Sequence, residues 1–282
     1  MELTIIGSGG CMTIPKPLCQ CEICTEAREK GVPYARSGPA IFIHDIQLLI
    51  DTPAEISIQL NRENIQKLDY VMFTHMDPDH VEGIRALEQI ALDFRTWRAY
   101  PEKKTTLIVP VSLLFELTKL QTVYGNIIDY YIAQGFIHLV DFVSQINIKG
   151  FTISALQINR QHEVSYIYVF ESEDKKIVYA PCDVKPFPEE NEAVHNADLL
   201  IIQPGIIEHG LKHDYVYPQN HISRKTLYTF DETLSLGKRI KADQILFTHL
   251  EEYWNRSHDD YLRLSKIIPD IAFAWDGMHV SV

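Results

Sequence analysis

The chain has 282 residues, 46% of them hydrophobic and 23% charged, which suits a globular protein with a sizeable buried core. Its formal net charge of -12 at pH 7, without clustered Lys and Arg, argues against long nucleic acids as partners. The apolar runs are far shorter than the roughly 20 residues of a bilayer span, and the start MELTIIGSGG lacks a basic signal-peptide region, so we expect a cytoplasmic protein without a membrane partner.

Apolar runs typical of strands intermix with helical patterns along the whole chain. In the first half, the strand-like runs are residues 3–7, 40–51, 70–73 and 106–110, and the helical patterns are 81–91 and 112–123. In the second half, strand-like runs recur at 151–158, 164–171, 175–180, 198–204 and 244–249, and helical patterns at 188–197, 222–240 and 259–268. With no low-complexity linker between the halves, we expect an α/β protein whose two similar lobes share one core, a single domain over residues 1–282.

Polar residues that can bind metals stand where the strand-like runs end. They are Asp51, His75, Asp183 and His249, with His162 in the turn NRQHE between two strands. Each has an ordinary explanation when taken singly, for example Asp51 as a turn former or His162 as a solvated hairpin residue. Together they predict a pocket on one edge of a layered sheet, where such loops converge.

The segment THMDPDH, residues 74–80, carries the densest group of these residues. His75 and Asp77 lie on one side of an extended segment, Pro78 turns the chain, and Asp79 and His80 begin a helix. Asp79 alone would suit a helix N-cap. The arrangement can instead offer two pairs of ligands to two neighbouring ions, and imidazole and carboxylate donors suit zinc, manganese or iron. Asp183 could then bridge the two ions.

This segment, THMDPDHVEG, resembles the H-x-H-x-D-H signature of the metallo-β-lactamase superfamily. The spacing to His162, Asp183 and His249 follows the later motifs of that superfamily. Within it, the chain is most similar to the phosphodiesterases of the carbon-phosphorus lyase pathway. The shared marks are GSGG, CQCEIC, ARSGPAIFI, LLIDT, Asn220-His221 and WDGMHV. The resemblance implies an αββα sandwich, that is, two mixed β-sheets packed face to face with helices on both outer faces.

The resemblance also implies a two-metal site and assigns its ligands. One ion would be held by His75, Asp77 and His162, and the other by Asp79, His80 and His249, with Asp183 as the bridge. Asp51 would support the site by orienting a ligand, and His221 would face the substrate phosphate as a general acid. The catalytic residues implied are therefore His221, Asp79 and Asp183.

One residue departs from the signature, because Asp77 replaces its second histidine. An oxygen donor there makes the site harder, which favours manganese or iron over zinc, as in the flavodiiron proteins of the same superfamily. The alternative is that Asp77 does not reach the ion, leaving the first position weak or empty. We expect two divalent ions, Mn, Fe or Zn, to be retained.

Cys19, Cys21 and Cys24 form a second group in a cysteine-rich loop at residues 11–24. Five cysteines without a secretion signal argue against a disulfide framework, and three thiols this close suit a structural zinc with one further ligand. The similar phosphodiesterases place a histidine where this chain has Glu252; Glu251, His258 or Cys11 could also complete the shell. Reduced surface thiols are the remaining alternative. We interpret Cys182 as a small buried residue.

The remaining histidines and one aromatic segment have less definite roles. His44, His138, His195 and His279 are interpreted as structural, and His209 and His213 as solvated loop residues that could line the pocket. Residues 86–136, rich in Trp and Tyr, are interpreted as an insertion that forms a lid or a dimer face, or packs into the core. A homodimer, the commonest soluble assembly, is the alternative to a monomer.

These features predict a hydrolase that uses metal-activated hydroxide on a small phosphodiester, a cyclic phosphate among the candidates. An alternative is an iron-dependent oxidative enzyme resembling protein B of pyrroloquinoline quinone biosynthesis, which shares the cysteine loop. A third is a non-catalytic metal-binding member. A relative of ribonuclease Z is disfavoured by the acidic charge.

Overall fold

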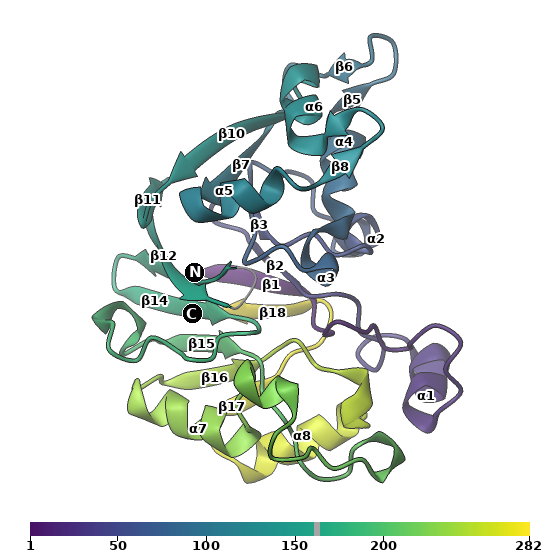
Figure 1. Cartoon of the computed structure of the whole chain (residues 1–282), viewed down its shortest axis with the longest axis vertical. Helices are drawn as coiled ribbons and strands as arrows, with labels where there is room; N and C mark the ends of the chain where they lie inside the picture. Colours follow the sequence, from purple (N-terminus) through teal and green to yellow (C-terminus); the bar gives the residue numbers. More distant parts are fainter. Residues whose placement is uncertain (161–163) are drawn as a thin grey trace.

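Two seven-stranded sheets form the centre of the computed structural model, which describes residues 1–160 and 164–282 (Figure 1). The first sheet has the order β10-β7-β4-β3-β2-β1-β18. Its strands are β1 (Glu2–Gly7), β2 (Ala40–Ile43), β3 (Leu48–Ile50), β4 (Tyr70–Met72), β7 (Thr105–Pro110), β10 (Ile137–Phe142) and β18 (Met278–Ser281). The second sheet runs in sequence order from β11 to β17. Its strands are β11 (Gln145–Ile148), β12 (Phe151–Asn159), β13 (Val164–Ser172), β14 (Lys175–Ala180), β15 (Leu199–Ile202), β16 (Gln244–Phe247) and β17 (Ile271–Phe273).

Helices cover the outer sides of both sheets, which gives the αββα sandwich expected from the sequence. The α-helices are α1 (Glu22–Lys30), α2 (Ile56–Arg62), α3 (Pro78–Val81), α4 (Ala86–Ala91), α5 (Val111–Leu117), α6 (Ile127–Gln134), α7 (Phe230–Arg239) and α8 (His258–Ile267). Helices α7 and α8 lie on the side of the second sheet that faces away from the first (Figure 1). None of the helices in the described part of the chain has the length and apolar character to cross a membrane.

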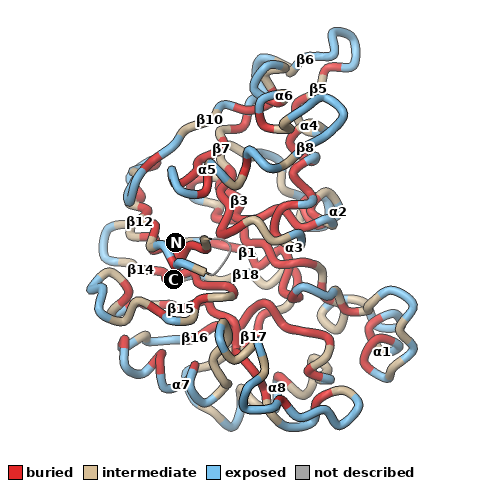
Figure 2. The backbone as a smooth tube through the Cα atoms, in the orientation of Figure 1, coloured by how far each residue is buried: buried red, intermediate tan, exposed pale blue. Residues whose placement is uncertain are grey.

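Strand β13 shows how the layers are held together. Its side chains alternate between two cores because successive residues of a strand point to opposite faces. Tyr168 and Phe170 pack in the core shared with the first sheet, whereas Ile167 and Val169 pack in the core beneath α7 and α8. A strand buried on both faces has the continuous apolar run seen in the sequence, and Figure 2 shows that the inner strands of the two sheets are largely buried.

The central strands of each sheet run parallel, and this places the strand ends of interest on one edge. Strands β3, β4 and β7 pair in parallel in the first sheet, as do β14, β15 and β16 in the second. Parallel strands end at the same side of their sheet, and the residues that follow them meet there. The predicted clustering of polar residues after the strands therefore has its structural basis.

Asp276, in the WDGM segment, connects three of the sequence motifs on which the family resemblance rests. Its Oδ1 accepts hydrogen bonds from the amide and hydroxyl of Ser8, at 2.9 and 2.8 Å. Its Oδ2 accepts one from the amide of Ser37, at 2.8 Å. Asp276 is buried, so these bonds satisfy a carboxylate that would otherwise be costly to bury. Asp276 thus links the WDGM segment to the GSGG and ARSG segments, and these hydrogen bonds hold the two ends of the domain together.

Several expected elements differ from the structure. The run 40–51 is two antiparallel strands, β2 and β3, because the chain turns between Ile43 and Leu48. The helix expected at 188–197 is a single 3-10 turn, η2 (Glu192–Val194), which ends where His195 becomes extended. The helix expected at 222–240 is divided into η4 (Ile222–Lys225) and α7, which begins at a capping box of Thr229 and Glu232.

The segment 86–136 is only partly an insertion. Strand β7 lies within it and is an inner strand of the first sheet, between β4 and β10. The remainder forms two short hairpins, β5 (Leu92–Asp93) with β6 (Arg98–Ala99) and β8 (Gln121–Thr122) with β9 (Gly125–Asn126), together with α4 to α6. Its aromatic residues divide in the same way, because Tyr131 is buried whereas Trp97 and Tyr124 are exposed.

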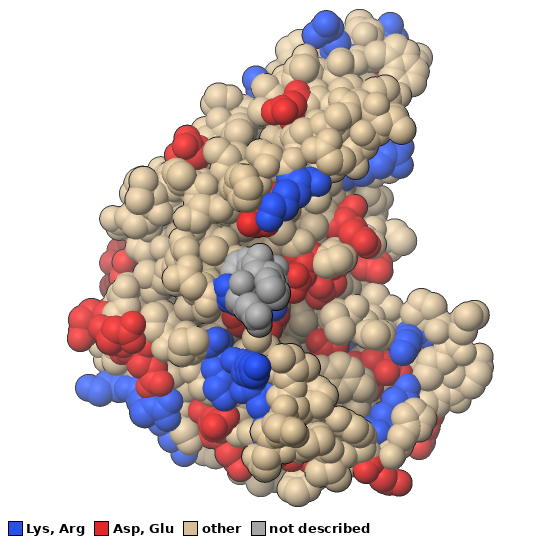
Figure 3. Space-filling model, viewed as in Figure 1, with Lys and Arg blue, Asp and Glu red and all other residues tan. Residues whose placement is uncertain are grey.

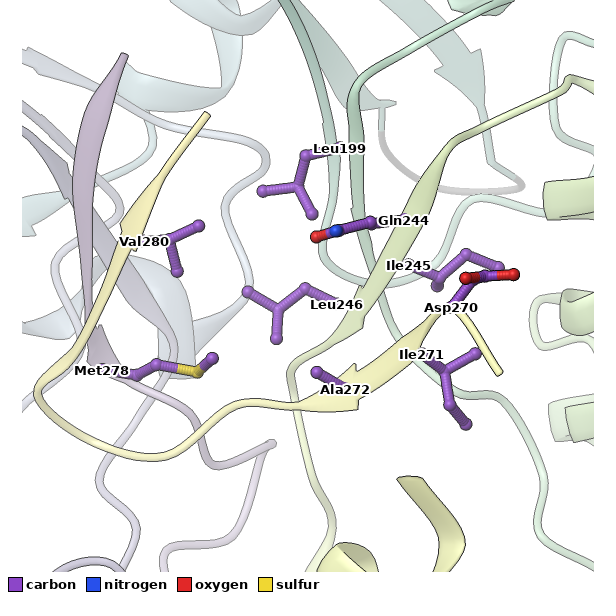
Figure 4. A pocket seen from close by; sticks show the side chains of 9 residues that line it. All are labelled: Leu199, Gln244, Ile245, Leu246, Asp270, Ile271, Ala272, Met278 and Val280. Carbon is purple, nitrogen blue, oxygen red and sulfur yellow. The ribbon is translucent and has the colours of Figure 1, made fainter. Parts of the chain in front are cut away.

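A groove of 320 Å³ lies between the edge strands of the two sheets, where β17 faces β18 (Figure 4). Leu199 and Gln244, the first residues of β15 and β16, line it, so it opens at the amino ends of these strands. Its lining is largely apolar, with Asp270 as the acidic exception. The groove is thus remote in the fold from the carboxyl ends of the strands.

Candidate metal centre

The carboxyl ends of the parallel strands bring together histidine, carboxylate and thiol groups from distant parts of the chain. We call this group the metal centre. Its members are His75, Asp77, Asp79, His80, Cys182, Asp183 and His249. Asp183 and His249, like the neighbouring Asp51, have positive φ angles of 54°, 55° and 66°. Such backbone costs energy in non-glycine residues and collects at functional sites, where the surrounding fold holds it in place.

Asp51 and Thr74 orient the first two histidines. The carboxylate of Asp51 lies 2.9 Å from Nδ1 of His80 and accepts a hydrogen bond from the hydroxyl of Thr74 at 2.9 Å. Because that hydroxyl donates to Asp51, its oxygen is left to accept from Nδ1 of His75, 3.0 Å away. Both Nδ1 atoms therefore carry a proton, and both Nε2 atoms face the other donors of the centre. Asp51 thus contacts a predicted metal ligand, as its expected supporting role requires.

Asp79, His80 and His249 form the tighter half of the centre. Nε2 of His80 lies 3.3 Å from Nε2 of His249. Oδ2 of Asp79 lies 3.5 Å from the former and 3.3 Å from the latter. All three come together as the sequence predicts, although His249 follows β16 and the other two begin α3. Four-coordinate zinc with bonds of 2.0–2.2 Å would separate such donors by about 3.3–3.5 Å, so these residues fit a divalent ion.

The other half of the centre contains His75, Asp77 and Asp183, whose donor atoms lie within 4.8 Å of one another. Oδ2 of Asp77 lies 3.3 Å from Nε2 of His75, so this carboxylate does reach the centre. The guanidinium of Arg160 contacts both carboxylates, at 3.5 Å from Asp77 and 3.3 Å from Asp183. Arg160 was not singled out in the sequence, and it supplies a positive charge here. The predicted ligand His162 lies outside the described residues.

Glu251 holds the ring of His249 from behind. Its Oε1 lies 3.2 Å from Nδ1 of His249, which leaves Nε2 directed at Asp79 and His80. A side chain on Gly10 would place its Cβ 2.2 Å from the carboxyl group of Glu251. The GSGG segment must therefore end in glycine so that Glu251 can occupy this position. Glu251 contacts His249 of the metal centre and does not join Cys19, Cys21 and Cys24, which excludes one of the fourth ligands left open by the sequence.

The electrostatics of the centre call for positive charge. Burial opposes charging of His80, yet Cys182 and Asp51 raise the pKa of this residue to about 9. Burial likewise opposes charge on Asp79, but the histidines around it lower the pKa of its carboxyl group well below the ordinary value. The cluster thus favours anionic carboxylates surrounded by cations. Divalent ions would supply that charge without the histidine protons, so the donor set fits the metals that the sequence resemblance implies.

A cavity of 150 Å³ opens beside Asp79. Glycine, cysteine and acidic residues line it, among them Gly10, Cys11, Glu55 and Glu82. Figure 3 shows a hollow between the upper and lower halves of the molecule in which acidic side chains gather. A substrate with a negative group would need cations at the centre to offset these carboxylates.

Cys19, Cys21 and Cys24 meet Glu252 in a second group, which we call the cysteine site. Their thiols lie 3.5, 3.7 and 3.3 Å from Oε1 of Glu252. Lys212, which the sequence analysis did not consider, contacts Glu252 and lies 3.1 Å from Sγ of Cys19. Burial opposes charge on Glu252, but Lys212 lowers the pKa of its carboxyl group overall.

The contacts around the cysteine site distinguish between the candidates for a fourth ligand. Glu252 is the residue that the structure places with the three thiols. Cys11 hydrogen-bonds to Glu251, and the ring of His258 packs against Tyr34 and Trp275. Three thiols and a carboxylate suit a tetrahedral zinc, as the sequence predicts.

His221 lies outside the clustered donors. Its Nδ1 accepts a hydrogen bond from the amide of Ser223 at 3.2 Å, and its ring packs edge-on against Tyr217 at 4.8 Å between centroids. The structure therefore fixes one side of the ring and leaves Nε2 for another partner. Among the described residues, no hydrogen bond or ion pair joins His221 to the metal centre, so its role toward substrate stays a prediction.

The metallo-β-lactamase fold is defined by these two mixed sheets, with histidines and carboxylates gathered on one edge. The family model described as Beta-lactamase superfamily domain matches residues 47–250, and the chain belongs to this superfamily. This match confirms the resemblance seen in the signature. No curated protein sequence matches the chain.

Solved structures similar to the chain extend over its whole length. A diphosphatase from the PhnP family is 22% identical, with a TM-score of 0.73 over 100% of this chain and 97% of that chain. Zn(2+)-bound PqqB from Methylobacterium extorquens is 17% identical, with a TM-score of 0.77 over 100% of both chains. Human tRNase Z, short form, is 15% identical, with a TM-score of 0.65 over 100% of this chain and 99% of that chain. At these identities the likeness is one of fold.

Proposed function

We propose that this protein is a metal-dependent hydrolase that cleaves a small phosphodiester, with a cyclic phosphate among the candidate substrates. The observation that supports this most strongly is the convergence of Asp79, His80 and His249 at separations suited to a divalent ion. The similar structures include a protein described as a diphosphatase, which also acts on phosphorus-oxygen bonds. The small cavity beside Asp79 favours a substrate of modest size.

The chain's own residues would divide the work of hydrolysis. Bound divalent ions would lower the pKa of a water molecule and stabilise negative charge on the phosphoryl group. Asp51 and Glu251 hold the histidine rings in the orientation that this requires. Asp79, 19% exposed in its side chain, borders the cavity and can orient the attacking water. His221 would donate a proton to the departing oxygen through Nε2, since its Nδ1 is already engaged.

Arg160 adds a charge that the signature does not include. Its guanidinium lies beside Asp77 and Asp183, with its side chain 16% exposed. A planar guanidinium at the rim of the centre can bind two phosphate oxygens at once. Arg160 would therefore help to hold an anionic substrate within otherwise acidic surroundings.

The proposal is tested by hydrolysis of a chromogenic phosphodiester. Purified protein should cleave it, and Asp183→Asn should abolish cleavage, because the change removes a carboxylate of the centre. Asp174→Asn, in an exposed turn, is the matched control and should retain activity. Absence of hydrolysis in the metal-replete wild type, across diesters and a pyrophosphate, would contradict the proposal.

A second candidate is an iron-dependent oxidative enzyme, because Asp77 gives the centre a carboxylate where the signature has histidine. The likeness to PqqB in fold is consistent with this alternative. Aerobic purification distinguishes the two: bound iron with substrate-dependent oxygen consumption supports oxidation, whereas zinc or manganese with phosphodiester cleavage supports hydrolysis. A preparation that binds metal but shows neither reaction supports the non-catalytic alternative.

A further inference from the structure

Cys182 lies inside the metal centre, although neither the sequence signature nor the proposed mechanism gives it a role. It follows β14, is 3% exposed, and points its thiol at two histidines. Its Sγ lies 3.6 Å from Nε2 of His75 and 3.5 Å from Nε2 of His80. Asp183, the next residue, instead approaches Asp77 and Arg160. The chain therefore directs the thiol, and not the neighbouring carboxylate, to the position between His75 and His80.

The ring nitrogens around Cys182 converge on one place. The Nδ1 atoms of His75 and His80 carry a proton, because their partners there accept hydrogen bonds. The Nε2 atoms are therefore the ones that face Cys182, and Nε2 of His249 lies 3.3 Å from that of His80. A neutral Cys182 offers these nitrogens one weakly donated hydrogen. A cation at this place would bind a thiolate and ring nitrogens together.

The separations fit metal coordination by a thiolate. Zinc bonds of about 2.3 Å to sulfur and 2.0–2.1 Å to nitrogen, at tetrahedral angles, place two nitrogens about 3.3 Å apart and nitrogen and sulfur about 3.5–3.6 Å apart. The nitrogens of His80 and His249 are 3.3 Å apart. The sulfur-to-nitrogen distances are 3.5 and 3.6 Å. Each of these distances falls within about 0.1 Å of the tetrahedral geometry.

We infer that Cys182 is a thiolate ligand of the metal centre and shares the ion of His80 and His249. This ligand changes the expected metal preference. Asp77 makes the centre harder, but a thiolate is a soft donor that selects zinc over manganese. The centre thus holds a soft position at Cys182 and a hard position at Asp77 and Asp183. The inference concerns the ligand set and stands whichever ester or other substrate the centre acts on.

Cobalt substitution tests this assignment without any substrate. A thiolate bound to cobalt gives an intense charge-transfer absorption in the near ultraviolet, and nitrogen or oxygen ligands do not. We expect Cys182→Ser to lose part of this absorption, and the affinity of the centre for zinc to fall by more than about 10-fold. Cys182→Asp should keep the metal content and lose the same absorption. Cys11→Ser, which removes the other thiol near the centre, is the control for loss of a thiol and should keep the charge-transfer absorption.

The cysteine site contributes equally to every variant, so the difference spectrum reports Cys182 alone. A Cys182→Ser protein with wild-type absorption and wild-type zinc affinity would overturn the assignment. If that variant does not fold, cadmium NMR of the wild type decides the question. A resonance from the centre shifted in the direction of sulfur ligation supports the assignment, and one typical of nitrogen and oxygen ligands alone contradicts it. Neither result depends on catalysis, so the proposed hydrolysis can fail while this inference holds.

Discussion

The metal centre and the cysteine site differ in how they are assembled. Three donors of the cysteine site lie between Cys19 and Cys24, and only Glu252 comes from elsewhere. The donors of the metal centre follow different strands of two sheets, from His75 to His249. The first group depends on one loop and its contact with Glu252, whereas the second depends on how both sheets are packed. Changes at the two sites should therefore separate into effects on stability and effects on chemistry.

The largest effect is expected from a substitution that affects the chemistry without altering the clustered donors. His221→Ala should lower turnover by about 10²-fold, the usual contribution of a general acid, with metal content unchanged. Hydrolysis kinetics together with elemental analysis check this. Ile222→Ala, an exposed neighbour, is the matched control. Unaltered turnover of the His221 variant would remove His221 from the mechanism.

A second substitution acts on the metal centre through the carboxylate of Asp51, which contacts His80. Asp51→Asn should weaken metal binding at the centre by about 10- to 100-fold, because Nδ1 of His80 loses its charged partner. Competition with a chelator measures this affinity. The cysteine site should keep its ion in the same sample. An equal loss of metal from both sites would show that the variant acts through general unfolding and not through the metal centre alone.

A third substitution acts on the cysteine site alone. Cys24 is fully buried, and its thiol lies 3.3 Å from Glu252. Cys24→Ser should lower the free energy of unfolding by about 2–3 kcal/mol, since a structural ion and its ligand are lost together. Denaturant unfolding measures the change, and Cys11→Ser is the control. Activity per folded molecule should be preserved; its loss would mean that the two sites are coupled.

The smallest effect on stability is expected for the ion pair between Arg239 and Glu189, which lies away from both sites. Nε of Arg239 is 2.6 Å from Oε2 of Glu189. The Arg239 hydrogen bond lowers the pKa of Glu189 below its ordinary value of 4.5. A lowered folded-state pKa gives stability that is present above the ordinary value and lost as the pH falls through the folded one. Arg239→Gln should therefore destabilise by about 0.2–1 kcal/mol at neutral pH, and the difference should vanish once the pH is below the folded-state pKa of Glu189. A difference that persists in acid would assign the effect to packing.

Much of this architecture could be predicted from the sequence, for identifiable reasons. The clustered residues Asp79, His80 and His249 follow apolar runs, and parallel strands must deliver such residues to one edge. The sequence also predicted that Cys182 is buried, which the structure confirms. It did not indicate that the thiol faces His75 and His80, because adjacent residues at a strand end point in different directions, and only the path of the chain decides which enters the centre. The helix expected at 188–197 was wrong because Asn191 caps a single turn and His195 is extended. Arg160 and Lys212 were missed because no local pattern links them to their acidic partners.

Glu252 illustrates which part of the cysteine site the spacing of the cysteines could predict. Spacing alone indicated a fourth ligand for Cys19, Cys21 and Cys24 and left several candidates. The resemblance to the phosphodiesterases pointed to position 252, and the structure places Glu252 there. The competing candidate Glu251 proved to hold His249 instead. Two neighbouring glutamates thus serve two different sites, which sequence spacing could not distinguish.

The most direct test of the central claim is elemental analysis of the purified chain beside its His80→Ala variant. The account predicts divalent metal at both sites of the wild type, and loss of the metal centre's share in the variant while the zinc of the cysteine site remains. A wild-type protein that takes up no metal beyond that at the cysteine site, or a variant with undiminished metal content, would contradict it.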